Sequence, residues 1–209
     1  MATRHCRRWP RCAAKHPADE RYRPLLPPPG ASRPPVSGPQ IRPRTRREIA
    51  RQRRPRGHQC WDHLIAAPLW PQHGANIGTL LRTCDAVGAC LAVPRLPWVP
   101  EALARGNTLR RPACVHWTRR DPCEWLADQR SAGSFIVGIE LAEEAVRLAD
   151  LPAARGRTIA VLGHERTGIP PEAIGLLDLA VEIPMVGTGA SLNVAVAGSL
   201  VLYRLAGFL

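Results

Sequence analysis

Short apolar runs recur along the chain from about residue 60 onward, and segments with helical spacing lie between them. Such runs fit strands buried on both faces, and their alternation with helices is typical of a mostly parallel sheet covered by helices. The predicted strands are Leu64 to Ala67, Ala89 to Val93, Cys114 to Trp117, Phe135 to Ile139, Thr158 to Leu162 and Leu179 to Ile183. This pattern predicts one α/β domain over residues 58–209, without an internal repeat.

Two helices have clear local signals. The first has its apolar positions at Ile77, Leu80, Leu81, Cys84 and Val87, which form one stripe at a period of 3.6 residues. Asn76 precedes this stripe, so we expect its side chain to cap the helix, while Arg82 lies on the polar face. The second helix is predicted to start at Asp121, where a capping carboxylate is followed by a proline and an acidic residue.

The charge is concentrated at the N-terminus. Residues 1–57 hold 16 of the 29 basic residues, 3 of the 17 acidic residues and 11 of the 22 prolines. The segment shows no periodicity that could bury a face, which predicts a disordered arm. Its arginines would neutralise nucleic-acid phosphates, so RNA is the expected partner. The alternatives are a solubilising tail or translated sequence upstream of the true start.

Several classes of protein are excluded or disfavoured. No apolar run approaches the roughly 20 residues of a membrane span, and the first twenty residues lack the apolar core of a signal peptide, so we expect a cytoplasmic protein without a membrane partner. Seven cysteines without a C-x-x-C pair indicate reduced thiols rather than disulfides or a zinc ribbon. His58, Cys60 and His63 lie close in sequence, but no fourth ligand has convincing spacing, so no metal is expected.

Three clusters of small and polar residues follow predicted strands. They are Asn76 to Gly88, Leu162 to Pro170 and Ile183 to Val196. Open α/β sheets bind ligands at the carboxyl ends of their strands, so the clusters predict one shared site. The G-x-G-x-x-G and G-x-x-x-x-G-K-[ST] patterns are absent, which gives no support to a Rossmann dinucleotide site or a P-loop.

With these three motifs in order, residues 60–209 resemble the SpoU (TrmH) branch of the SPOUT RNA methyltransferases. The resemblance implies transfer of a methyl group from S-adenosyl-L-methionine to a ribose 2′-hydroxyl of tRNA or rRNA. It also implies a C-terminal deep trefoil knot, an exception to the usual unknotted chain, and a homodimer whose interface completes the active site. The apolar segment Ser191 to Leu205 independently favours burial in a core or between subunits.

The resemblance also assigns site residues. It places Arg82, Asn76, Glu165, Ser191 and Asn193 in the catalytic set. It places Leu162, Gly163, Glu165, Gly168, Ile183, Met185, Gly187, Ser191, Leu192 and Asn193 around the cofactor. Gly187 is expected to let its loop turn tightly.

Alternatives remain open at this stage. Arg82 either deprotonates the ribose hydroxyl with help from a substrate phosphate, or anchors that phosphate while another group takes the proton. Each residue also has a structural explanation. Arg82 could pair with Asp85, Asn76 could only cap its helix, and Glu165 could be an exposed loop acid. Ser191 and Asn193 could start the final helix, and Gly163, Gly168 and Gly187 could be turn glycines. The motifs favour tRNA over rRNA as substrate. The rivals are an rRNA-specific enzyme, a catalytically silent RNA-binding or assembly factor, and a methyltransferase for a protein or small molecule.

Overall fold

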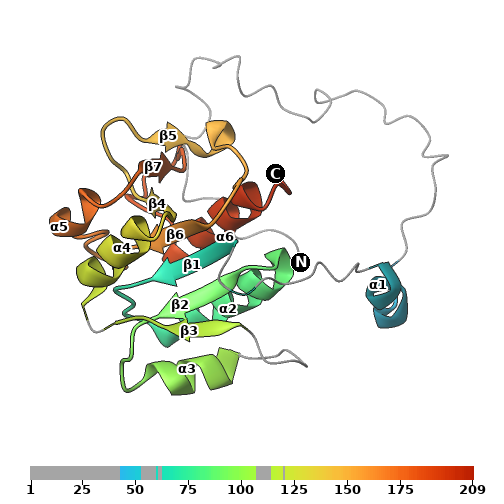
Figure 1. Cartoon of the computed structure of the whole chain (residues 1–209). Coiled ribbons are helices and arrows are strands. Elements are labelled where there is room, and N and C mark those ends of the chain that lie inside the picture. The colour runs from blue at the N-terminus through green and yellow to red at the C-terminus, as the bar shows by residue number, and fades with distance from the viewer. Residues whose placement is uncertain (1–42, 53–59, 61–62, 107–113, 120) are drawn as a thin grey trace, which may run out of the picture. The chain divides into compact units, whose positions relative to one another are not determined.

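The computed structural model describes residues 43–52, 60, 63–106, 114–119 and 121–209 (Figure 1). It separates into two units, residues 1–52 and 53–209. In the first unit the short helix α1 (Arg46–Gln52) begins with a capping box. The backbone N–H of Glu48 donates to Thr45 Oγ1 over 3.3 Å, and the N–H of Thr45 donates to the Glu48 carboxylate over 2.8 Å. The predicted disordered arm over residues 1–57 therefore contains a helix, and residues 1–42 and 53–57 of it lie outside the described residues.

The second unit is built on a seven-stranded parallel sheet in the order β3-β2-β1-β6-β4-β7-β5. Its strands are β1 (Leu64–Pro68), β2 (Cys90–Val93), β3 (Val115–Trp117), β4 (Phe135–Ile139), β5 (Val146–Arg147), β6 (Thr158–Leu162) and β7 (Leu179–Glu182). The predicted parallel α/β fold is confirmed, and each predicted strand is present with ends within one residue. The two-residue strand β5 was not predicted because it has no apolar run of its own.

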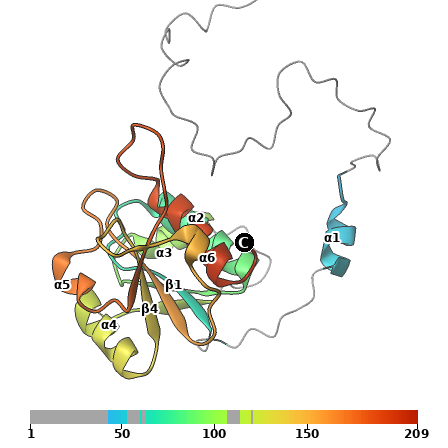
Figure 2. The ribbon, with the colours of Figure 1, turned by 90° about the horizontal axis from the view of Figure 1, so that it is seen from above.

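Helices cover both faces of this sheet, as Figure 1 and Figure 2 show. The helices are α2 (Gly74–Val87), α3 (Val99–Gly106), α4 (Pro122–Ser131), α5 (Pro171–Ile174) and α6 (Val194–Leu205), with a 3₁₀ turn at Leu148–Asp150. One core joins α2, α3 and α6 to one face of the sheet, and a second core joins α4 and α5 to the other. Alternate residues of β1 serve the two cores: Leu64 and Ala66 face the first, Ile65 and Ala67 the second.

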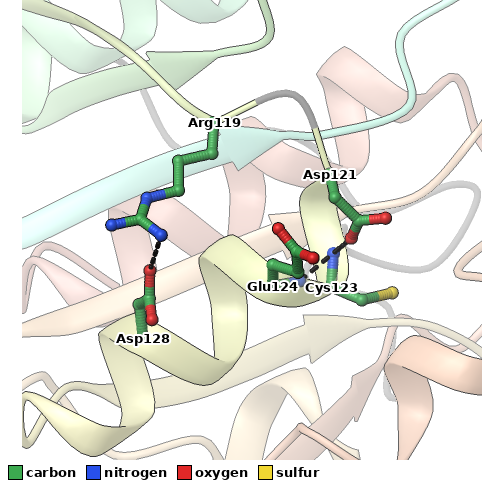
Figure 3. Close-up of polar contacts among 5 residues, drawn as sticks. All are labelled: Arg119, Asp121, Cys123, Glu124 and Asp128. Carbon is green, nitrogen blue, oxygen red and sulfur yellow. Dashed lines mark hydrogen bonds and ion pairs between the residues drawn. The ribbon is translucent and has the colours of Figure 1, made fainter.

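The start of α4 follows the predicted capping pattern (Figure 3). The backbone N–H groups of Cys123 and Glu124 donate to Asp121 Oδ1 over 2.8 and 2.9 Å. These bonds satisfy two of the donors that a helix leaves open at its N-terminus. Arg119, which precedes α4, forms a 3.0 Å ion pair with Asp128 of this helix, and both side chains are largely exposed. Such an exposed pair contributes little, so the cap dominates at this helix end.

The start of α2 differs from the expectation that Asn76 caps it. The helix begins at Gly74, and the N-cap position is His73, whose side chain makes no capping hydrogen bond. Asn76 is therefore the third residue inside the helix, and its side chain is 8% exposed. The expectation was wrong because the apolar stripe begins at Ile77, whereas the helical backbone starts one turn earlier. A residue distant in sequence, Glu165, supplies the missing cap.

Helix α6 accounts for the apolar C-terminal segment. Its inner face is buried against the sheet and α2, and Thr83 Oγ1 of α2 lies 2.8 Å from Ser199 Oγ of α6. Its outer face keeps apolar side chains in solvent: Val196 is 47% exposed and Tyr203 is 37% exposed. The helix is thus buried on one side only within a single chain.

Candidate ligand-binding site

A pocket of about 360 Å³ lies at the carboxyl edge of the sheet, where the loops after β4, β6 and β7 meet the segment before α6. Seven of the residues expected around the cofactor line it: Gly163, Glu165, Gly168, Ile183, Met185, Ser191 and Leu192. The second and third sequence motifs therefore share one hollow, at the end of the sheet where open α/β folds bind ligands.

The other predicted site residues lie elsewhere. Leu162 is fully buried in the core beneath the pocket. Gly187 is not among the lining residues, its φ is not positive, and a Cβ built there would meet nothing within 4 Å. The chain bends at Gly187, but in a conformation that does not require glycine. Asn76, which is buried, and Asn193, which is exposed, do not line the pocket either, and their side chains are joined by a hydrogen bond.

A hydrogen-bond network joins the three motifs. Asn76 Nδ2 donates to Glu165 Oε1 over 2.9 Å, and Asn193 Nδ2 donates to Asn76 Oδ1 over 3.0 Å. Asn193 Oδ1 in turn accepts the backbone N–H groups of the first residues of α6, at 2.9 and 3.2 Å, as the N-cap of that helix. One chain of hydrogen bonds therefore fixes the start of α6 to α2 and to the loop after β6.

Glu165 also takes the capping role that Asn76 was expected to fill. Its carboxylate accepts the backbone N–H of Gln72 over 2.8 Å and that of His73 over 3.0 Å, just before α2 begins. Partial burial raises the pKa of Glu165, but the hydrogen bonds from Asn76, from the backbone of its own loop, from His73 and from Gln72 lower that pKa more. The net pKa of Glu165 lies below its ordinary value, so the carboxylate is a weak base that stays ionised at neutral pH.

The loop that carries Glu165 is shaped by two glycines. The backbone N–H of His164 donates to the carbonyl of Gly168, and the N–H of Gly168 donates back to His164, both over 2.9 Å. A Cβ on Gly163 would overlap the backbone of Gly168 and Ile169, and Gly168 has φ of 71°. A side chain at either position would therefore force the loop open.

Glu140 is a pocket residue that sequence reasoning missed. Its Oε2 accepts the backbone N–H of Ile169 over 2.7 Å, which ties the end of β4 to the loop after β6. The signal was available, because Glu140 directly follows the predicted strand Phe135 to Ile139 at the ligand-binding edge. With Glu165 and Glu182 it gives the pocket three carboxylates against the single guanidinium of Arg166.

Arg82 lies outside this pocket. It is exposed on α2 and lines a second hollow of about 590 Å³ together with Gln72, His73 and Arg105. It forms no ion pair with any residue that the structure describes, Asp85 included. Glu165 lines the first pocket, and its carboxylate accepts from the backbone of Gln72 and His73, which line the second, so the two hollows adjoin at Glu165.

The fold and the pocket define an α/β protein of the open parallel-sheet class with a ligand-sized hollow at the carboxyl edge of its strands. None of the described helices is both long and apolar enough to cross a bilayer. The sequence model of the SpoU rRNA Methylase family matches residues 67–203, and the chain belongs to this family. The resemblance inferred from the three motifs is thereby confirmed.

Individual relatives agree with this assignment. The tRNA (guanosine(18)-2'-O)-methyltransferase of Escherichia coli strain K12 is 33% identical over 134 residues, which cover 62% of this chain and 56% of the relative. The 23S rRNA (guanosine(2553)-2'-O)-methyltransferase RlmP of Bacillus subtilis strain 168 is 29% identical over 140 residues, covering 65% and 55%. The chain spans about half the length of these curated relatives.

A solved structure matches the fold as well. The SpoU methyltransferase AviRb from Streptomyces viridochromogenes, in complex with the cofactor AdoMet, superposes with a TM-score of 0.56 at 28% sequence identity. The match covers 69% of this chain and 60% of that chain.

Proposed function

We propose that the chain is an S-adenosyl-L-methionine-dependent transferase that methylates a ribose 2′-hydroxyl of RNA, with tRNA as its substrate in preference to rRNA. The observation that carries the proposal is the convergence of the second and third motifs on one pocket, in a chain that belongs to the SpoU family. The named relatives include enzymes for both RNA classes, and the tRNA enzyme is the more similar of the two reported.

The pocket fits the proposed cofactor. Its volume falls within the range of small-molecule sites, and Ile183, Met185 and Leu192 offer apolar walls for a nucleoside base. Of the three carboxylates, Glu182 is paired with Arg147, and the other two against the guanidinium of Arg166 still favour a ligand that carries positive charge. When bound, S-adenosyl-L-methionine supplies an electrophilic methyl group on a cationic sulfonium. The lining residues of the pocket would hold this cofactor, and Gly163, which has no side chain, would let the cofactor come close to the backbone.

Asn76, Glu165 and Asn193 act in this proposal as positioning residues. Their polar atoms bind one another, and the lowered pKa of Glu165 makes its carboxylate a poor acceptor for the proton of a ribose hydroxyl. Their role is to hold the pocket wall, α2 and α6 in one geometry. Methyl transfer depends on in-line alignment of the hydroxyl with the methyl group, so such positioning contributes directly to the rate.

Arg82 is proposed to bind the RNA. Its guanidinium is charged at all physiological pH values, so it suits bidentate binding of a substrate phosphate and stabilisation of a developing alkoxide better than proton removal. Its exposed position on α2, in the hollow next to the pocket, supports this role.

A homodimer is part of the proposal. Apolar side chains around the pocket and on α6 are exposed in the single chain: Leu141, Met185, Val186, Leu192, Val196 and Tyr203. Exposed apolar surface of this kind marks an interface, and a second copy would cover it. The family resemblance implies that the interface completes the active site, so the Arg82 that serves each pocket is proposed to come from the second copy. The C-terminal trefoil knot belongs to the same proposal and rests on the family resemblance.

The basic N-terminal segment is proposed to contribute to RNA binding. Residues 1–57 carry a net charge of +13 from the counts of basic and acidic residues. Within the described part, Arg47 and Arg51 are exposed on α1. Contacts of such residues with phosphates release counterions and add affinity without base specificity. A cytoplasmic role in tRNA processing fits this substrate.

The first experiment measures transfer of labelled methyl from S-adenosyl-L-methionine to separate unmodified tRNA and rRNA pools, with nucleoside mass spectrometry of the products. We expect a 2′-O-methyl nucleoside in the tRNA pool. Arg82→Ala should lower the rate by about 100-fold or more, as loss of a transition-state donor does, with unchanged binding of the cofactor by calorimetry. Arg105→Ala, which removes another arginine of the same hollow, is the matched control and should retain the rate.

Other products would redirect the assignment. A methylated nucleoside confined to rRNA would identify an rRNA enzyme. Cofactor and RNA binding without transfer would favour the silent RNA-binding factor.

For the dimer, mixing Arg82→Ala with Gly163→Ala by co-expression should restore about one quarter of wild-type activity, because half of the dimers are mixed and each then holds one complete site. No restoration would contradict a site shared between subunits.

A further inference from the structure

Three cysteines and one histidine lie together beside the amino-terminal ends of β2 and β3. Cys90 is the first residue of β2, Cys114 directly precedes β3, His116 lies in β3, and Cys60 comes shortly before β1. One ligand atom from each residue lies within 4.8 Å of all the others. Because all strands are parallel, this cluster is at the edge of the sheet opposite to the ligand pocket.

The four ligand atoms are arranged around Cys114. Its Sγ lies 3.2 Å from Cys90 Sγ, 3.4 Å from Cys60 Sγ and 3.1 Å from His116 Nε2. Cys60 Sγ lies 3.2 Å from the same Nε2. Zinc with bonds of about 2.3 Å to sulfur and about 2.0 Å to nitrogen holds tetrahedral ligands roughly 3.5 to 3.8 Å apart. The observed cluster needs only small shifts of the side chains to reach that geometry.

A disulfide does not account for this arrangement. Its sulfur atoms would be about 2.05 Å apart, well below both Sγ–Sγ distances in the cluster. It would also use only two of the four groups and leave a third thiol and the imidazole beside it. Thiols are weak hydrogen-bond donors and acceptors, so contacts among them give little reason for three thiols and an imidazole to gather.

We propose that Cys60, Cys90, Cys114 and His116 bind one zinc ion as a structural site. Three thiolates and one imidazole form a complete tetrahedral ligand set, which leaves no open position for catalysis. The proposal is independent of methyl transfer, because none of the four residues lines the pocket at the other edge. It replaces the expectation of a chain without metal.

The role of the ion follows from the elements that it would join. Strand β3 has three residues and lies at the edge of the sheet, with β2 as its single strand neighbour among the described residues. Cys60 comes from the segment that leads into β1, on the far side of β2 from β3. The ion would therefore hold the edge strand and this segment to the sheet, and it would join Cys60 and Cys114 across a sequence separation of 54 positions.

The test uses the full chain, purified without chelators after expression in zinc-supplemented medium, with metal content measured by plasma mass spectrometry. We expect about one zinc ion per chain for a tetrahedral site of this kind. Cys60→Ser and His116→Ala should lose most of it. Cys123→Ser is the matched control, because Cys123 is a partly buried thiol outside the cluster, and it should keep the full content.

A second measurement covers the case that a variant fails to fold. Cobalt added to wild-type protein after zinc removal should give the intense visible bands of tetrahedral cobalt with thiolate charge transfer, and added zinc should abolish them. The proposal would be overturned by wild-type protein without zinc and without these bands. It would also be overturned by equal zinc loss in Cys123→Ser, or by a Cys90–Cys114 disulfide found by mass spectrometry in protein that has full methyl-transfer activity.

Discussion

Replacement of Asn76 by alanine tests whether the hydrogen-bond network holds the three motifs together. The side chain is buried and donates to the carboxylate of Glu165 while it accepts from Asn193. A bond to a charged group contributes about 1.5–3 kcal/mol and a neutral bond about 1 kcal/mol, with the lower values expected here because Glu165 is partly exposed. Alanine recovers roughly 0.6 kcal/mol of helix propensity. We expect a net destabilisation of about 2 kcal/mol.

The loss should depend on pH. Since the hydrogen bonds hold the pKa of Glu165 below its ordinary value in the folded chain, its ionised form stabilises the fold above the unfolded pKa of about 4.3. That contribution disappears as the pH falls through the lower folded pKa. In Asn76→Ala the pKa of Glu165 returns toward its ordinary value. The difference in stability between wild type and variant should therefore be complete at pH 7 and shrink below about pH 4.

Urea unfolding followed by circular dichroism, in a pH series from neutral downward, measures this difference as a shift in midpoint at constant slope. Thr79→Ala is the matched control, because Thr79 is an exposed polar residue of the same helix that bonds only to the local backbone carbonyl of Ala75. The reasoning fails if Asn76→Ala is no more destabilised than Thr79→Ala, or if its loss is the same at pH 7 and below pH 4.

Two further substitutions probe the pocket loop and the cap of α4. Gly163→Ala places a methyl group against the backbone of the pocket loop, so we expect a loss of about 1–3 kcal/mol in urea unfolding and at least about tenfold weaker cofactor binding by calorimetry; unchanged binding would contradict the close approach. Asp121→Ala removes both capping bonds of α4 and should cost about 1 kcal/mol in the same unfolding assay, while Asp121→Asn should recover most of it and cofactor binding should not change.

The sequence predicts the strands well because each is a continuous apolar run that ends in polar or small residues. It also predicts the cap at Asp121, where donor and acceptor are only two and three residues apart. The local sequence pattern does not predict the cap of α2. The group that caps this helix is Glu165, which lies in another loop, 92 residues from His73 and 93 from Gln72. Caps supplied across the fold leave no local signature.

The sequence predicts the site in part, because some of its residues belong to local motifs and others do not. The pocket residues Gly163, Ile183 and Leu192 belong to motifs that can be recognised in the sequence. Glu140 falls outside every motif, and its one sequence signal is its position directly after a predicted strand, which the pairing of β4 with β6 and β7 brings to the pocket. The residues of the proposed zinc site could not be grouped from the sequence for the same reason. Cys90 and Cys114 are 24 residues apart and have no ligand spacing in the sequence, but the register of β2 and β3 makes them neighbours.

The hydrogen-bond network also determines when the pocket can form during folding and synthesis. Asn76 binds side chains 89 and 117 positions further along the chain, and β1 pairs with β6, so the site depends on contacts of very high sequence separation. Such contacts form late and slow the folding of a domain. A nascent chain that has not yet released α6 from the ribosome lacks Asn193 and one wall of the pocket. Partly synthesised chains therefore cannot sequester the ligand before the last helix has docked.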